Sequence, residues 1–159
     1  MLIDESNLRQ ITIDVCQSML GLELTPIDPE IAATRQLVAS VEIRGDRLTV
    51  VEVFAHDHLI TQIAEVMFSS EGGSLSEEEI RDGFGEIANM IGGNVKGSLG
   101  EEAALSLPVV GRAFDWLSQL PHGCLQTTFE CCGYPLSIVV RDVDADLLAV
   151  ADSKEDCSE

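Results

Sequence analysis

The segment from Ser76 to about Leu99 constrains the fold most, because a helix start signal is followed there by a sustained apolar stripe. Ser76 and Glu79 have the spacing of a capping box, in which each side chain bonds the backbone amide of the other residue. Four apolar residues then recur at helical spacing: Ile80, Phe84, Ile87 and Ile91. At about 100° per residue they share one narrow face, which predicts a helix buried on that face against another layer.

The same helix carries a polar stripe nearly opposite the apolar one. Its members lie three or four residues apart: Asp82, Glu86, Asn89 and Gly93. Glu86 and Asn89 should therefore point together into solvent, about one turn apart. A solvated polar face is the ordinary interpretation of such a stripe.

Glycines add a second constraint to this helix. Its five glycines are Gly83, Gly85, Gly92, Gly93 and Gly97. Each glycine costs a helix roughly 1 kcal/mol relative to alanine, so this number indicates a need for close backbone approach. We expect Gly93, on the polar stripe, to let a partner come close. The other four glycines should permit packing against the sheet or a neighbouring helix.

The rest of the pattern predicts an α+β domain. Further helices are expected over residues 5–22 and 58–69, and residues 25–34 form a loop. β-rich runs cover residues 36–44, 47–55, 105–111, 125–132 and 136–143, and Gly45–Asp46 marks a hairpin. This order predicts a mainly antiparallel sheet with two long helices packed on it. We expect residues 1–151 to form one domain and residues 152–159 an acidic tail.

The charge balance narrows the choice of partners. Among 159 residues, 28 are acidic and 9 are basic, which gives a formal net charge of −19. Nucleic acids and anionic membrane surfaces need a basic surface, so both are excluded, and a protein or small molecule remains. No apolar run approaches the roughly 20 residues of a membrane span, and Met1–Glu5 does not resemble a signal peptide. Five cysteines without CxxC spacing favour a reducing, cytoplasmic setting.

The helix also carries a family resemblance. The run Asp82–Gly93, DGFGEIANMIGG, closely resembles the signature helix of the CheC/CheX/FliY phosphatases. In that family an Asp or Ser is followed after three residues by Glu and after two more by Asn, with a proline further on. Asp82, Glu86 and Asn89 match in identity and spacing, and Pro108 is the natural counterpart of the proline. Residues 5–22 contain no second Glu-x-x-Asn pair, so the chain resembles the one-site CheX type.

The resemblance implies dephosphorylation of the phosphoaspartate of a CheY-like response-regulator receiver. It implies that Asn89 orients the attacking water and that Glu86 docks a receiver lysine. Asp82 and Pro108 would shape the substrate-binding surface, to which Gly93 belongs by its place on the stripe. The resemblance also implies a homodimer and no cofactor of the chain's own, because Mg²⁺ is held by the receiver. A non-catalytic receiver-binding or flagellar-switch adaptor is the alternative, and the intact Glu86/Asn89 pair favours the enzyme.

Two other groups of reactive side chains need an interpretation. His56 and His58 alternate like two ligands on one strand face, but no third ligand is in register, so no metal site is expected. We expect a turn there, with Asp57 capping the following helix. Cys131 and Cys132 are adjacent in a predicted strand, where successive side chains point to opposite faces. One thiol should therefore be buried and the other exposed.

Overall fold

The computed structural model describes residues 3–28, 36–68, 75–100, 102–113 and 124–143. Its elements are α1 (Glu5–Leu20), β1 (Thr25–Pro26), β2 (Gln36–Arg44), β3 (Leu48–His56), α2 (Asp57–Met67), α3 (Glu77–Leu99), β4 (Ala104–Leu105), β5 (Val109–Ala113), β6 (Leu125–Cys131) and β7 (Tyr134–Val143). The predicted tail over residues 152–159 lies outside the described residues. The predicted α+β class is confirmed, with the two long helices as α1 and α3 and a shorter α2 beside them.

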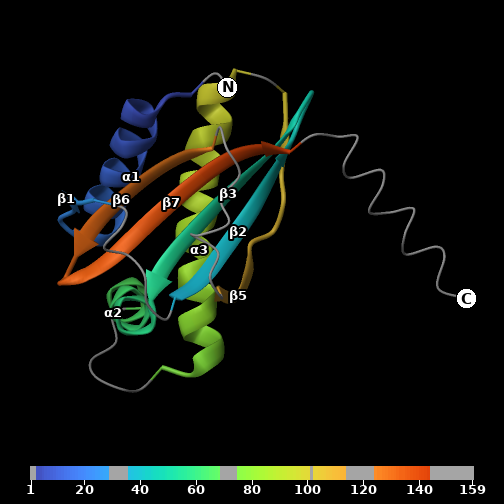
Figure 1. Cartoon of the computed structure of the whole chain (residues 1–159). Helices are drawn as coiled ribbons and strands as arrows, with labels where there is room; N and C mark the ends of the chain where they lie inside the picture. The colour runs from blue at the N-terminus through green and yellow to red at the C-terminus, as the bar shows by residue number, and fades with distance from the viewer. Residues whose placement is uncertain (1–2, 29–35, 69–74, 101, 114–123, 144–159) are drawn as a thin grey trace, which may run out of the picture.

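The strands form one antiparallel sheet in the order β1-β6-β7-β3-β2-β4, and β5 also pairs with β2. The expected hairpin is confirmed, because β2 and β3 pair over their full lengths, from Gln36 with His56 to Arg44 with Leu48. Figure 1 shows α3 running along the sheet, with α1 beside it and α2 crossing near its N-terminal end. None of the helices in the described parts of the chain is long and apolar enough to span a membrane.

Both faces of the central sheet are buried. On one face, Val51 and Val53 of β3 pack with helix residues such as Ile87 in a single core. On the opposite face, Phe54 is fully buried, and Glu52 forms an ion pair of 2.8 Å with Arg141 of β7. Strands buried on both faces lose the alternation of apolar and polar residues. The run from Thr49 to Ala55 is accordingly buried at every position.

The edge of the sheet departs from the expected strand over residues 105–111. Two short strands, β4 and β5, stand in its place, and the segment from Ser106 to Pro108 separates them. Pro108 has no backbone N–H, and proline in a sheet is confined to edge strands, strand starts and bulges. The prediction of one continuous strand was therefore wrong at Pro108 for a reason already visible in the sequence.

Close approach explains three of the four glycines that were assigned to packing on α3. A Cβ added at Gly92 would lie 2.5 Å from Cγ2 of Val41 in β2. Added at Gly83 or Gly85, it would lie 3.3 Å from Ala64 or Pro108. At Gly97 nothing lies within 4 Å, so the expectation that Gly97 permits packing was wrong. The space at Gly93 is likewise open, as its place on the polar stripe requires.

The adjacent cysteines are divided as predicted, with Cys131 buried and Cys132 exposed in the turn between β6 and β7. Cys132 has φ of 52°, a left-handed conformation that lets the chain reverse within the Cys132–Gly133 turn. Burial raises the pKa of Cys131 to about 12 and that of Cys16 to about 11. Both thiols are therefore uncharged at physiological pH.

We predict that Gly92→Ala lowers the free energy of unfolding by about 1–3 kcal/mol, because its new methyl group would overlap Val41 in a packed interface. Gly97→Ala is the matched control on the same helix, where the methyl group meets open space. It should leave stability unchanged or raise it by up to about 1 kcal/mol, because alanine favours the helix. Urea unfolding of both variants measures the difference. Equal effects of the two substitutions would contradict the close contact.

We predict that brief treatment of the native protein with a maleimide at pH 8 modifies Cys132 well before Cys131 and Cys16. The thiolate is the reactive form, and only Cys132 of these three is exposed. Peptide mapping by mass spectrometry identifies the labelled positions. The same reaction in denaturant should modify all three cysteines at comparable rates. Rapid labelling of Cys131 in the native state would show that β6 is not buried as described.

Candidate functional site

The polar stripe of α3 points away from the sheet, as its periodicity predicts. Asp82, Glu86 and Gly93 are exposed and Asn89 is half-buried. The opposite side of the helix is anchored in the core, where Phe84 and Ile87 are fully buried. The direction of the stripe is therefore set by burial of the apolar side, and no contact of the polar side chains is needed to hold it.

α3 begins at the position that the sequence predicted. The expected capping box is present: the Glu79 amide donates to Ser76 Oγ at 3.1 Å, and the Ser76 amide donates to Glu79 Oε1 at 3.2 Å. Glu77, Glu78 and Glu79 place negative charge in the first turn, where it interacts favourably with the helix dipole. These local interactions stabilise the helix end that precedes Asp82.

Glu86 and Asn89 are free to bind. Within the described residues, neither side chain forms a hydrogen bond or ion pair with another group. By contrast, Asn94 on the same helix donates to the carbonyl oxygen of Met90 at 2.8 Å. The carboxamide of Asn89 therefore keeps both a donor and an acceptor available, and Glu86 keeps two acceptor oxygens available one turn away.

Pro108 lies beside this pair because of a β-bulge. Leu105 pairs with Ile43, and Val109 pairs with Ser40. Between these pairs, the three residues 106–108 of the edge strand face only the two residues 41–42 of β2, so the edge strand contains one extra residue. The bulge sits where the edge strand passes α3.

The extra residue changes which side chains reach α3. Leu105 and Val110 are five positions apart, so in a regular strand they would point to opposite faces. With the bulge, Leu105 lies against Gly92, while Pro108 and Val110 lie against Gly85. Gly85 directly precedes Glu86 and is one turn before Asn89. Pro108, packed on Gly85, therefore borders one side of the Glu86/Asn89 pair.

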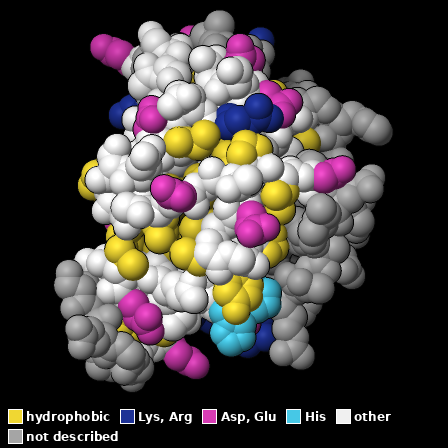
Figure 2. Space-filling model, turned by 90° about the vertical axis from the view of Figure 1, so that its left-hand side faces the viewer, with side chains coloured by type: hydrophobic (Ala, Val, Ile, Leu, Met, Phe, Trp, Pro, Cys, Tyr) yellow, Lys and Arg dark blue, Asp and Glu magenta, His cyan; other side chains and the backbone are white. Residues whose placement is uncertain are grey.

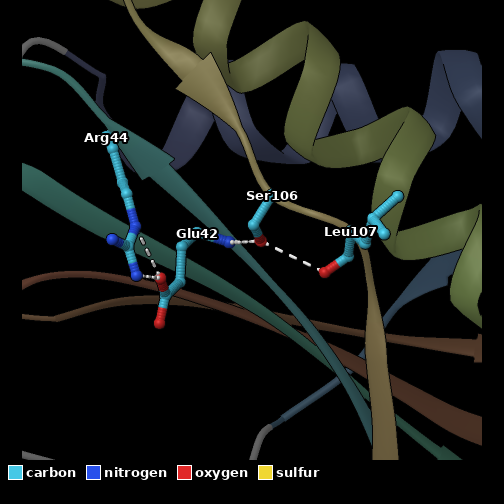
Figure 3. Close-up of polar contacts among 4 residues, drawn as sticks. All are labelled: Glu42, Arg44, Ser106 and Leu107. Carbon is cyan, nitrogen blue, oxygen red and sulfur yellow. Dashed lines mark hydrogen bonds and ion pairs between the residues drawn. The ribbon is translucent and has the colours of Figure 1, made fainter.

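Ser106 holds the bulge against β2 (Figure 3). Its amide donates to the carbonyl oxygen of Glu42 at 2.9 Å, and the Glu42 amide donates to Ser106 Oγ at 2.8 Å. The Ser106 hydroxyl in turn donates to the Leu107 carbonyl oxygen at 3.1 Å. The Glu42 carboxylate bonds Arg44 at 2.7 Å. Ser106 thus satisfies backbone groups that a bulge would otherwise leave unpaired.

The structure brings the predicted site residues together on one surface. Asp82, Glu86, Asn89 and Gly93 share the exposed stripe, and Pro108 borders it. The sequence interpretation did not find Ser106 or the exposed Leu107. The signal for both was a proline inside a predicted strand, which marks an edge or a bulge. The roles of these residues remain predictions.

The histidine pair is arranged differently from the expectation. Asp57 was expected to cap α2, but His56 is the N-cap: its Nδ1 accepts the His58 amide at 3.1 Å. The rings of His56 and His58 stack with centroids 5.2 Å apart, and Tyr134 stacks on His56 at 4.9 Å. Figure 2 shows the two histidines together beside an apolar patch. The described residues contain no group of three or more His, Cys, Asp or Glu that could hold a metal.

Comparison with protein families gives a match over residues 37–132 to CheX, described as chemotaxis phosphatase CheX. This match covers most of the sheet and all of α2 and α3. No curated protein sequence matches the chain.

Solved structures share the fold. The chain is similar to CheX in the CheX-CheY-BeF3-Mg complex from Borrelia burgdorferi, with a TM-score of 0.72, 15% identity, and coverage of 91% of this chain and 100% of that one. For chemotaxis protein CheX from Vibrio vulnificus the TM-score is 0.71 at 21% identity, with 90% and 99% covered. Thermotoga maritima FliY gives 0.58 at 17% identity, with 89% and 86% covered.

Proposed function

Because the chain belongs to the CheX family of chemotaxis phosphatases, we propose that it hydrolyses the phosphoaspartate of a CheY-like receiver. The observation that carries this proposal is the pair of exposed Glu86 and half-buried Asn89, which lie one turn apart on a helix anchored in the core. Neither side chain has a hydrogen-bond or ion-pair partner among the described residues. Pro108 borders the pair and limits access to it from one side.

The reaction asks for positioning more than for a strong nucleophile. A phosphoaspartate is an activated acyl phosphate, so a water held in line with the scissile bond suffices. The water oxygen attacks phosphorus, the bond from phosphorus to the aspartate oxygen breaks, and aspartate and inorganic phosphate are the products. In this proposal the Asn89 carbonyl oxygen accepts a hydrogen bond from the water. Its amide donates to a phosphoryl oxygen and so fixes the direction of attack.

Glu86 supplies the docking contact in this proposal. Its carboxylate would pair with a receiver lysine beside the phosphoryl group, one helical turn from the point where Asn89 enters. Mg²⁺ is expected in the receiver and not in this chain. Asp82 and Gly93 continue the same stripe on either side, so we assign them to the contact surface and not to the chemistry.

Assembly and location remain expectations in this proposal. We expect a homodimer, and β5, which pairs only with β2 among the described strands, offers a free backbone edge to a second copy. We also expect the protein to work in the cytoplasm, where receivers and reduced thiols are found.

We predict that Asn89→Ala lowers the rate of phosphate release from a receiver phosphorylated with acetyl phosphate by about 10²–10³-fold. Its fold should survive, because Asn89 makes no hydrogen bond that packing depends on. Asn94→Ala is the control: it removes an asparagine from the same helix outside the stripe. Both variants are checked by circular dichroism. Near-normal turnover by folded Asn89→Ala protein would remove Asn89 from the mechanism.

We predict that Glu86→Lys raises KM for the phosphorylated receiver by about 5- to 150-fold and changes kcat less, because a contact made before the transition state appears in KM. Glu77→Lys, also exposed on α3, makes the same change in net charge outside the stripe and should act weakly. Steady-state kinetics over a range of receiver concentrations separates the two constants. A collapse of kcat at unchanged KM would place Glu86 in the chemistry.

The same assay tests the adaptor alternative. An adaptor binds the phosphorylated receiver but leaves its phosphoryl group in place. Wild-type protein that binds a phosphorylated receiver yet never accelerates phosphate release, across the receivers of its own organism, would favour the adaptor over the enzyme.

A further inference from the structure

Two exposed apolar side chains border the polar stripe without any role so far. Leu107, next to Pro108 in the bulge, has 86% of its surface exposed. Phe68, at the C-terminal end of α2, has 46% exposed. Single exposed apolar side chains are common on protein surfaces, so it is the position of these two beside the stripe that sets them apart.

The segments that carry these two side chains lie on opposite sides of the stripe. Phe68 lies against Gly83, because a Cβ added there would be 3.5 Å from Phe68 Cε2, and Pro108 lies against Gly85. Residues two positions apart in a helix, such as Gly83 and Gly85, are separated by about 200° around its axis. The exposed arc between Gly83 and Gly85 therefore holds the stripe, with Phe68 at one border and the bulge at the other.

The bulge makes Leu107 a fixed projection. Ser106 is bonded to β2 by two hydrogen bonds, and Pro108 is packed on Gly85, so both neighbours of Leu107 are held. In Figure 3 the Leu107 side chain points away from Glu42 and Arg44. An apolar side chain that is exposed yet held in place loses little conformational entropy when a partner covers it.

We propose that Leu107 and Phe68 are apolar docking contacts for the receiver, which they contact on either side of Glu86 and Asn89. This inference rests on the proposed function, since the occupant is the receiver whose phosphoryl group Asn89 reaches. The two contacts would set the depth to which the stripe enters the receiver's pocket. Leu107 and Phe68 are then positioning residues, and they touch neither the water nor the phosphoryl group.

Continuity and charge favour the receiver over a second copy as the occupant. Phe68 lies against Gly83, and Leu107 adjoins Pro108, which lies against Gly85, so a partner that reaches Asn89 passes close to both. Val109, also exposed at 67%, faces the other side of the sheet, because its partner Ser40 pairs with Glu52 on that face. A second copy would also bring two acidic stripes together, in a chain with a net charge of −19.

The test compares Leu107→Ser with Val109→Ser in the full-length protein. Leu107→Ser should raise KM for a receiver phosphorylated with acetyl phosphate by about 5- to 30-fold, with kcat within about twofold of wild type. Val109→Ser removes another exposed apolar side chain, two residues away on the other face of the sheet, and should leave KM unchanged. Phe68→Ser should raise KM in the same direction. Unchanged KM in both Leu107→Ser and Phe68→Ser overturns the proposal.

Two further measurements separate this inference from the proposed function. Direct binding to a receiver activated with beryllium fluoride is measured by calorimetry for wild type and Leu107→Ser. If wild type binds without turnover and Leu107→Ser weakens that binding, the docking surface stands and the phosphatase proposal falls. Light scattering reports the oligomeric state. If Leu107→Ser dissociates a dimer while KM stays constant, a second copy covers Leu107 and the docking proposal falls.

Discussion

The close approach of α3 to β2 is the contact on which the site depends. At Gly92 there is no room for a side chain, because an added Cβ would lie 2.5 Å from Val41. A helix held this close to the edge of the sheet comes within reach of the edge strand as well as the sheet face. The contacts of Leu105 with Gly92 and of Pro108 with Gly85 follow from the same spacing. The glycines lower the intrinsic stability of the helix, but they allow α3 to pack close to the sheet.

The bulge and the helix act together. One extra residue opposite β2 lets Leu105, Pro108 and Val110 all face α3, which a regular strand with alternating side chains would not permit. It also interrupts the sheet edge between β4 and β5, so that the longer uninterrupted stretch of this edge is β5. The extra residue therefore shapes the border of the stripe and shortens the continuous edge that is open to strand pairing.

The sequence predicted what local periodicity determines. The direction of Glu86 and Asn89 followed from helical spacing, and the start of α3 followed from its capping box. The extra residue of the bulge could not be predicted from the sequence, because it depends on the register between β2 and a strand some 64 residues further along the chain. The N-cap of α2 was predicted one residue too late. His56, an uncommon N-cap residue, accepts the backbone hydrogen bond that Asp57 was expected to accept. Gly97 was misassigned because composition alone cannot tell a packed glycine from an exposed one.

Charge explains why apolar contacts matter at this surface. A protein with a net charge of −19 that approaches an anionic phosphoryl group gains nothing from long-range attraction. At physiological ionic strength the Debye length is about 8 Å, so the repulsion is screened until the surfaces nearly touch. Binding must then come from short-range contacts: a specific ion pair, a neutral carboxamide that enters without adding charge, and burial of apolar surface. Asn89 suits the position closest to the phosphoryl group for this reason, since a carboxylate there would repel both the phosphoryl oxygens and the electron-rich transition state.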